Sequence, residues 1–134
     1  NPDLAIAIDS TPAGDLPRHD LVESNLYNTK LGFGPALYTS DSSTLSDPRL
    51  IRHLVKVGDK YKIPYQFRQP GGGGTNAGSI HLQRGGIPAV SVSVPGRYAH
   101  SAAMISRVKD WEDTVNLVHA FLLDLTPDLL KADR

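Results

Sequence analysis

Two side chains in this 134-residue sequence have the chemistry and the surroundings of metal ligands. Asp9 directly follows the apolar run Leu4–Ile8, and a carboxylate held at the end of a strand can bind a hard or borderline cation. His100 follows a second apolar run, and histidine is a common metal ligand and general base. Ordinary interpretations also stand: Asp9 can cap a turn through backbone amides, and His100 can be a solvated loop residue.

A run of four glycines, Gly71–Gly74, precedes Thr75 and Asn76. Its spacing matches neither the Walker-type phosphate loop nor the dinucleotide-binding fingerprint. Two interpretations remain. The run can cradle an anion at the N-terminus of a helix, where free amides converge. It can equally be a turn whose missing side chains let the backbone approach another element closely.

Several other chemistries are excluded by composition and motif. The chain has no cysteine, so it has no thiolate metal site, cysteine nucleophile or disulfide scaffold. It has no Gly-x-Ser-x-Gly nucleophile elbow and nominates no carboxylate pair for glycoside hydrolysis. Its 14 Lys and Arg balance 14 Asp and Glu, which argues against nucleic-acid and membrane-surface partners. No apolar stretch approaches the ~20 residues of a membrane-spanning helix. We expect one domain from a reducing compartment, the cytoplasm.

The elements that must position Asp9 and His100 alternate between strands and helices. Strands are expected at residues 4–8, 35–39, 63–68 and 89–95, with a short one near 20–22. Helices are expected from Asp47–Pro48 to about residue 60, from a Thr75 cap to about residue 84, and after a cap at Asp110. The last helix should bury an apolar stripe, made of Trp111, Val115, Val118, Leu122 and Leu125. This order predicts an α/β domain with a mostly parallel or mixed sheet, which binds ligands beyond the carboxyl ends of its strands.

Four segments, in this order and spacing, resemble the C-terminal part of the dinuclear-metal aminopeptidases of the glutamyl-aminopeptidase type. They are Ala5–Asp15, Gly72–Leu82, Gly86–Pro88 and Arg97–Ser101. Members of that family build tetrahedral particles (TET), and some were once labelled endoglucanases. The resemblance implies a three-layer α/β/α zinc-exopeptidase-like domain. It also implies that a water activated by two divalent ions, zinc or cobalt, removes N-terminal residues from peptides. Asp9 would then bind one ion and His100 the other.

The resemblance covers only part of the family's catalytic machinery. The general-base glutamate, a second glutamate ligand, a histidine and a bridging aspartate all precede the Asp9 strand in the family. Here the only glutamates are Glu23 and Glu112, both downstream of Asp9. We therefore expect residues 1–134 to be the C-terminal half of the catalytic domain, without its N-terminal portion and inserted dimerisation domain. No general base is assigned within the chain, and this piece alone should be inactive.

Substrate and partner expectations follow from the same resemblance. Thr75 and Asn76 should line the active-site cleft, although many relatives carry aspartate where this chain has Asn76. The substrates would be peptides with a free N-terminus, and the intact protein would form homodimers that build toward a dodecamer. A second hypothesis is that the protein is not an enzyme, since no general base accompanies the two candidate ligands in this chain. In it, the chain is a non-catalytic interaction or assembly module that keeps the fold without a complete metal site.

Overall fold

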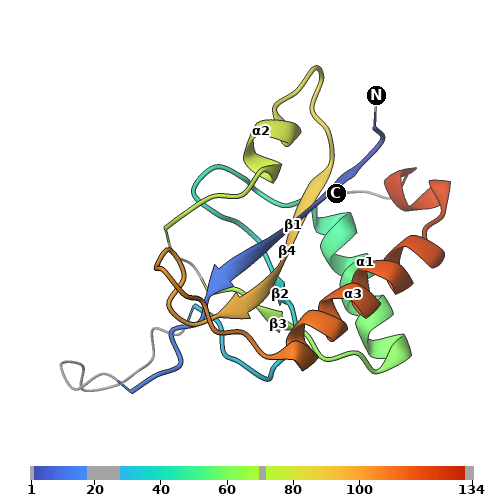
Figure 1. Cartoon of the computed structure of the whole chain (residues 1–134). Coiled ribbons are helices and arrows are strands. Elements are labelled where there is room, and N and C mark those ends of the chain that lie inside the picture. Colours follow the sequence, from blue (N-terminus) through green and yellow to red (C-terminus); the bar gives the residue numbers. More distant parts are fainter. Residues whose placement is uncertain (1, 18–27, 70–71, 132–134) are drawn as a thin grey trace.

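The computed structural model describes residues 2–17, 28–69 and 72–131, which form a layered α/β domain (Figure 1). In chain order the elements are β1 (Ala5–Pro12), β2 (Ala36–Leu37), α1 (Pro48–Tyr61), β3 (Gln66–Phe67), α2 (Ala77–His81), β4 (Ala89–Gly96), α3 (Val108–Leu123) and the 3-10 helix η1 (Pro127–Lys131). None of these helices combines the length and the apolar character needed to cross a bilayer. Glu23 and the strand expected near residues 20–22 lie outside the described residues.

The four strands form one mixed sheet in the order β1-β4-β2-β3. β1 and β4 are parallel and pair along their whole length, from Ala5 opposite Ala89 to Pro12 opposite Gly96. β2 runs antiparallel to β4, and β3 runs parallel to β2. The sheet therefore matches the mixed arrangement expected from the sequence. It also brings the segment that carries Asp9 directly beside the strand that leads to His100.

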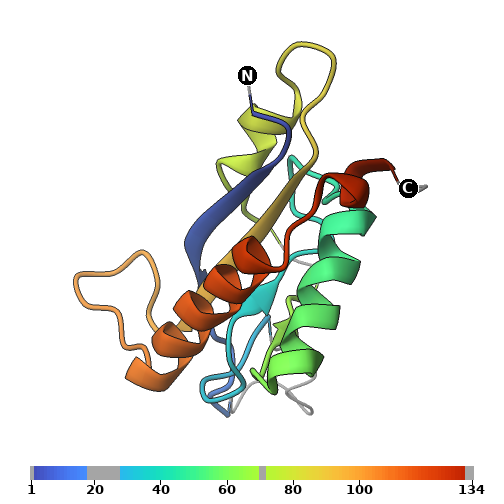
Figure 2. The same cartoon turned by 90° about the vertical axis from the view of Figure 1, so that its right-hand side faces the viewer.

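The sheet lies between two layers of helix, as the resemblance implied (Figure 2). Helices α1 and α3 cover one face, where the main core contains Leu37, Leu50, Leu54, Val57, Val90, Val92, Leu117, Ala120 and Phe121. The short helix α2 covers the other face, where its Ala77 packs against Ala7 of β1 and Ala89 of β4. Because side chains alternate along a strand, β4 sends Val90 and Val92 to the main core and Ser91 and Ser93 to the opposite face. The three-layer α/β/α prediction is confirmed.

The boundaries of several elements differ from the sequence-based expectation. β1 does not stop at Asp9, because Ser10–Pro12 continue the ladder with β4 and the Ala13 amide still donates to the Gly96 carbonyl at 2.8 Å. The strands expected at 35–39 and 63–68 shrink to two residues each. The helix expected to run from Thr75 to about residue 84 covers only Ala77–His81, and its N-cap is Asn76. Asp9 is thus a residue within a strand.

Helix α1 begins where the sequence predicts. A side-chain oxygen of Asp47 accepts a hydrogen bond from the Arg49 amide at 2.9 Å, and Pro48 occupies the first helical position. The helix ends at Tyr61, and Lys62 adopts the left-handed conformation with φ 55°. The capping aspartate and the proline at the first position are both local signals in the sequence, which is why the start of the helix could be predicted.

Gly58 lies inside α1, and we expect its replacement by alanine to destabilise the protein, the opposite of the usual effect in a helix. Glycine to alanine normally stabilises a helix interior by about 1 kcal/mol. A Cβ at Gly58 would lie 2.6 Å from Cδ1 of Tyr65, closer than real Cβ contacts. We therefore expect Gly58→Ala in the intact protein to lower the free energy of unfolding by about 1–3 kcal/mol, measured by urea denaturation. The same change in a Tyr65→Ala background should stabilise. A gain in the wild-type background would contradict the packing argument.

Helix α3 buries a different face from the one predicted. Its buried residues are Asp110, Asp113, Thr114, Leu117, Ala120 and Phe121, which follow the helical spacing of three and four residues. Of the stripe expected in the core, Trp111, Val115 and Leu122 have 57%, 47% and 54% of their surface exposed. Its other two members, Val118 and Leu125, pack against the main core and are partly buried. The expected Asp110 cap is also wrong, because the helix begins at Val108. The misassignment arises because the first two turns bury polar side chains, which an apolar periodicity cannot detect.

Candidate metal centre

Asp9 and His100, 91 positions apart in the chain, line the same small recess at the carboxyl end of β1 and β4. Its volume is about 170 Å³. The residues that line it are Asp9, Ser10, Pro12, Tyr38, Arg68, Gly72, Gly73, Gly74, Ala99, His100 and Met104. The two candidate ligands are therefore brought together, and three glycines of the run form part of the wall. We call this feature the metal recess.

Asp9 presents an exposed carboxylate to the recess. Its Oδ1 accepts a hydrogen bond from the Ser10 amide at 2.8 Å. Among the described residues, no cationic side chain forms an ion pair with it. The neighbouring amide satisfies one oxygen, as the turn-capping interpretation allows, and Oδ2 is left available for another partner. This arrangement suits a carboxylate that binds a cation.

His100 lies on the loop that follows β4. Arg97 and Ile105 close this loop by exchanging backbone hydrogen bonds of 2.8 and 3.1 Å. Within it, Tyr98 and His100 both have φ 63°, a left-handed conformation that non-glycine residues rarely adopt. The Ser101 Oγ lies 2.6 Å from the Tyr98 carbonyl oxygen and 2.9 Å from that of Ala103, so its one proton can be donated to either carbonyl within the loop. No hydrogen bond joins the His100 ring to another described residue, so the backbone alone sets its direction.

The donor set fits a borderline divalent cation but is incomplete. A carboxylate and an imidazole suit zinc or cobalt. Ser93, paired with Asp9 in the ladder, is fully buried, and its hydroxyl has no hydrogen-bond partner among the described residues. Ser93 does not itself line the recess. No group of three or more His, Cys, Asp or Glu side chains gathers within residues 2–17, 28–69 and 72–131. Protein zinc sites take three or four ligands, so further ligands are required.

Arg68 is a recess residue that the sequence analysis missed. Its side chain is buried, lies 4.6 Å above the Tyr38 ring, and donates from Nη2 to the Gly72 carbonyl at 2.6 Å. It therefore places a positive charge at the wall of the recess and fixes one end of the glycine run. In the sequence it is one polar residue at the end of an expected strand, and no local signal distinguishes it.

Thr75 and Asn76, expected near the substrate, do not line the metal recess. The Thr75 hydroxyl is hydrogen bonded to Asp41 Oδ2 at 3.1 Å and to Ser91 Oγ at 2.6 Å. Asn76 is exposed at the start of α2, and its side chain makes no capping bond. Their part in substrate binding stays a prediction. Asp41, which also accepts from the Thr75 amide, joins the polar turn 40–43 to the glycine run.

The glycines next to this turn permit a close approach of backbone. A Cβ at Gly74 would lie 2.8 Å from Ser43 Oγ, and one at Gly78 would lie 2.1 Å from the same atom. In addition, the Ser42 amide donates to the Gly73 carbonyl at 3.1 Å. Within the run itself, only Gly74 of the described glycines makes such a contact, because a Cβ at Gly72 or Gly73 would meet nothing within 4 Å. Both interpretations of the glycine run therefore stand.

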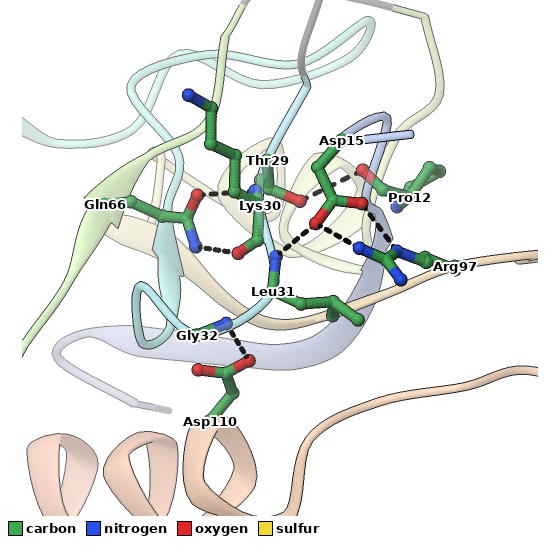
Figure 3. A network of polar contacts seen from close by, with 9 residues as sticks. All are labelled: Pro12, Asp15, Thr29, Lys30, Leu31, Gly32, Gln66, Arg97 and Asp110. Carbon is green, nitrogen blue, oxygen red and sulfur yellow. Dashed lines mark hydrogen bonds and ion pairs between the residues drawn. The ribbon is translucent and has the colours of Figure 1, made fainter. Parts of the chain in front are cut away.

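A network of polar contacts supports the loops around the recess (Figure 3). Asp15 forms a two-pronged ion pair with Arg97, from Oδ1 to Nε at 2.7 Å and from Oδ2 to Nη2 at 3.0 Å. The Leu31 amide donates to Oδ2 at 3.0 Å. The hydrogen bond from Arg97 outweighs the effect of burial and lowers the pKa of Asp15. The carboxylate therefore remains charged well into acid solution, and the ion pair persists there.

The comparisons with known proteins agree with this architecture. The sequence profile of a family described as M42 glutamyl aminopeptidase matches residues 1–117. A glutamyl aminopeptidase of Lactococcus lactis is 30% identical over 128 residues, which cover 96% of this chain and 34% of that protein.

Solved structures give the same result. An aminopeptidase from the archaeon Desulfurococcus kamchatkensis is 34% identical with a TM-score of 0.89, over 97% of this chain and 36% of the other. The TET1 peptidase of Pyrococcus horikoshii, whose title describes assembly into a tetrahedron or a large octahedral shell, is 25% identical with a TM-score of 0.68. That match covers 90% of this chain and 33% of the other. A Thermotoga maritima structure titled an endoglucanase is 28% identical with a TM-score of 0.65, covering 89% and 33%.

The chain spans about a third of the length of each of these proteins. The family profile matches residues 1–117 of the 134 in this chain, and the similarity to the Desulfurococcus kamchatkensis structure extends over 97% of the chain. This chain belongs to the M42 glutamyl aminopeptidase family.

Proposed function

We propose that this chain is part of a metal-dependent aminopeptidase and contributes Asp9 and His100 to a site for two divalent cations. The observation that carries the proposal is the convergence of these two side chains on one recess, Asp9 from β1 and His100 from the loop that follows the adjacent parallel strand β4. Membership of an aminopeptidase family supports the peptidase activity. The metal dependence rests on the residues themselves: a carboxylate with an available oxygen and a nearby imidazole without a hydrogen-bond partner among the described residues.

The residues of the recess would have different roles. Asp9 and His100 would hold the cations, which supply a Lewis acid and an activated water for hydrolysis of the first peptide bond. The Arg68 guanidinium contributes positive charge at the wall, and its contact with Gly72 keeps the glycine run in place.

The described part of the chain supplies no general base to the recess. Apart from Asp9, no carboxylate of residues 2–17, 28–69 and 72–131 lines it, so we propose that the base comes from another part of the protein. Glu112 does not line the recess, and Glu23 lies outside the described residues. The isolated chain should therefore be inactive. By analogy with the assembly printed for one structural relative, we propose that the intact protein forms a homo-oligomer. Its location in the cytoplasm stays an expectation from the sequence.

The test is a metal titration of the intact protein after removal of bound metal. With zinc or cobalt we expect two ions per chain, chelator-sensitive release of the first residue from peptides, and no release from peptides with an acetylated N-terminus. Asp9→Asn should reduce tight binding to at most one ion. Asp128→Asn, at an exposed site on η1, is the matched control and should bind two. A folded intact protein that binds no metal would overturn the enzyme proposal and favour the assembly module.

A further inference from the structure

The Asp15–Arg97 ion pair joins the two segments that carry the candidate ligands. Asp15 lies three residues beyond the end of β1, the strand that contains Asp9. Arg97 directly follows the end of β4 and begins the loop that contains His100. Neither residue lines the metal recess. The pair is therefore placed to act on the recess indirectly, through the backbone of both segments.

The geometry of the pair makes it a rigid connection. Both Asp15 oxygens accept from the Arg97 guanidinium, and the planar fork fixes orientation as well as distance. The Asp15 side chain is only 10% exposed, and that of Arg97 is 32% exposed, so water screens the pair less than it screens a surface pair. The Leu31 amide provides a third anchor for the carboxylate. Figure 3 shows these contacts converging on Asp15.

Arg97 is also the residue that closes the His100 loop. Its backbone exchanges hydrogen bonds with Ile105, so its position fixes the base of the loop. His100 is three residues further on, in a left-handed conformation, and its ring is not held by hydrogen bonds from the described residues. A shift of the loop base is therefore transmitted directly to the imidazole.

We propose that Asp15 and Arg97 are positioning residues that set the separation of His100 from Asp9 and so determine how tightly metal is bound. This inference rests on the proposed function, because it assumes that Asp9 and His100 bind metal. It differs from a general stabilising role, since its main effect is on metal affinity. Losing a residue that orients a metal ligand typically costs 10- to 100-fold in affinity, and we expect a loss of about that size here.

The test measures zinc affinity of the intact protein by competition with a chelator. Arg97→Lys keeps the positive charge but lacks the two-pronged fork, so it should weaken zinc binding about 10-fold or more. Arg97→Ala and Asp15→Asn should each weaken it by about 10- to 100-fold. Because the two residues act as one unit, the double variant Asp15→Asn/Arg97→Ala should lose no more than the weaker-binding single variant.

A matched control separates positioning from stability. Lys60→Ala removes another ion pair, with Asp124, that joins α1 to the end of α3 away from the recess. Its zinc affinity should equal that of the wild type, and thermal unfolding of every variant is measured without metal. If the wild type binds no zinc, the proposed function fails. If the wild type binds zinc and Arg97→Lys, folded, binds it equally well, the positioning role is overturned. An equal loss in Lys60→Ala would also overturn it.

Discussion

Replacement of Asp9 or His100 by alanine is expected to lower peptide hydrolysis by the intact protein at least about 1,000-fold. The reason is that each change deletes a proposed ligand itself, whereas loss of a residue that merely orients a ligand costs about 10- to 100-fold. Both side chains are exposed at the recess, so their removal leaves no buried group unpaired, and thermal stability without metal should be unchanged. The measurement is kcat/KM for release of an N-terminal residue at saturating zinc or cobalt.

The control for this experiment is His119→Ala, which removes an exposed histidine from α3 without touching the recess. It should retain wild-type kcat/KM. Retention of more than a tenth of the activity in Asp9→Ala would mean that the carboxylate is not a ligand, and that its hydrogen bond from Ser10 is its main role. A loss in His119→Ala as large as that in His100→Ala would show that histidine removal acts through the fold.

The second large effect is expected on stability, from Asp110→Ala. Asp110 is 1% exposed and accepts hydrogen bonds from the Gly32 amide at 2.7 Å and the Gly34 amide at 3.0 Å. Alanine leaves both amides without their partner in a largely buried setting, and each such loss costs about 1–3 kcal/mol. We expect the free energy of unfolding to fall by about 3–5 kcal/mol in denaturant titrations of the intact protein.

A graded pair of variants distinguishes this mechanism from simple loss of charge. Asparagine at position 110 retains one oxygen acceptor, so Asp110→Asn should cost clearly less than Asp110→Ala. Asp128→Ala removes an exposed carboxylate and should have no measurable effect. Should Asp110→Ala change the unfolding free energy by less than about 1 kcal/mol, the two amides must be satisfied in another way.

The features of the fold that the sequence predicted are those set by neighbouring residues. Helix α1 follows from Asp47 and Pro48 at its start, and β4 follows from the alternation of valine and serine. The end of β1 could not be predicted, because Ser10–Pro12 are a strand only by virtue of their pairing with Val94–Gly96. The buried face of α3 could not be predicted either. Asp110 can be buried because its carboxylate accepts hydrogen bonds from amides 76 and 78 residues away.

In the candidate site, too, some residues could be predicted from the sequence and others could be recognised only in the fold. The residue types and the family resemblance nominated Asp9 and His100, and the fold places both on one recess. Arg68 had no local signal. Asp15 and Arg97 belong to two of the family-like segments, but their pairing could not be predicted because they are 82 residues apart. Tertiary packing alone gives these residues their surroundings. The substrate role expected for Thr75 and Asn76 stays a prediction, because the fold directs the Thr75 hydroxyl to Asp41 and Ser91.

The position of β1 at the end of the described sheet has a consequence for the geometry of a two-ion centre. One side of β1 is paired with β4, while its other side is free of strand partners among the described residues. A strand added there would lie about 4.8 Å away, and its side chains on the Asp9 face would come about 5 Å from those of β1. Two ions in such centres lie about 3.5–4 Å apart. Ligands from an added strand would thus be within reach of the same pair of ions, with Asp9 between them and His100.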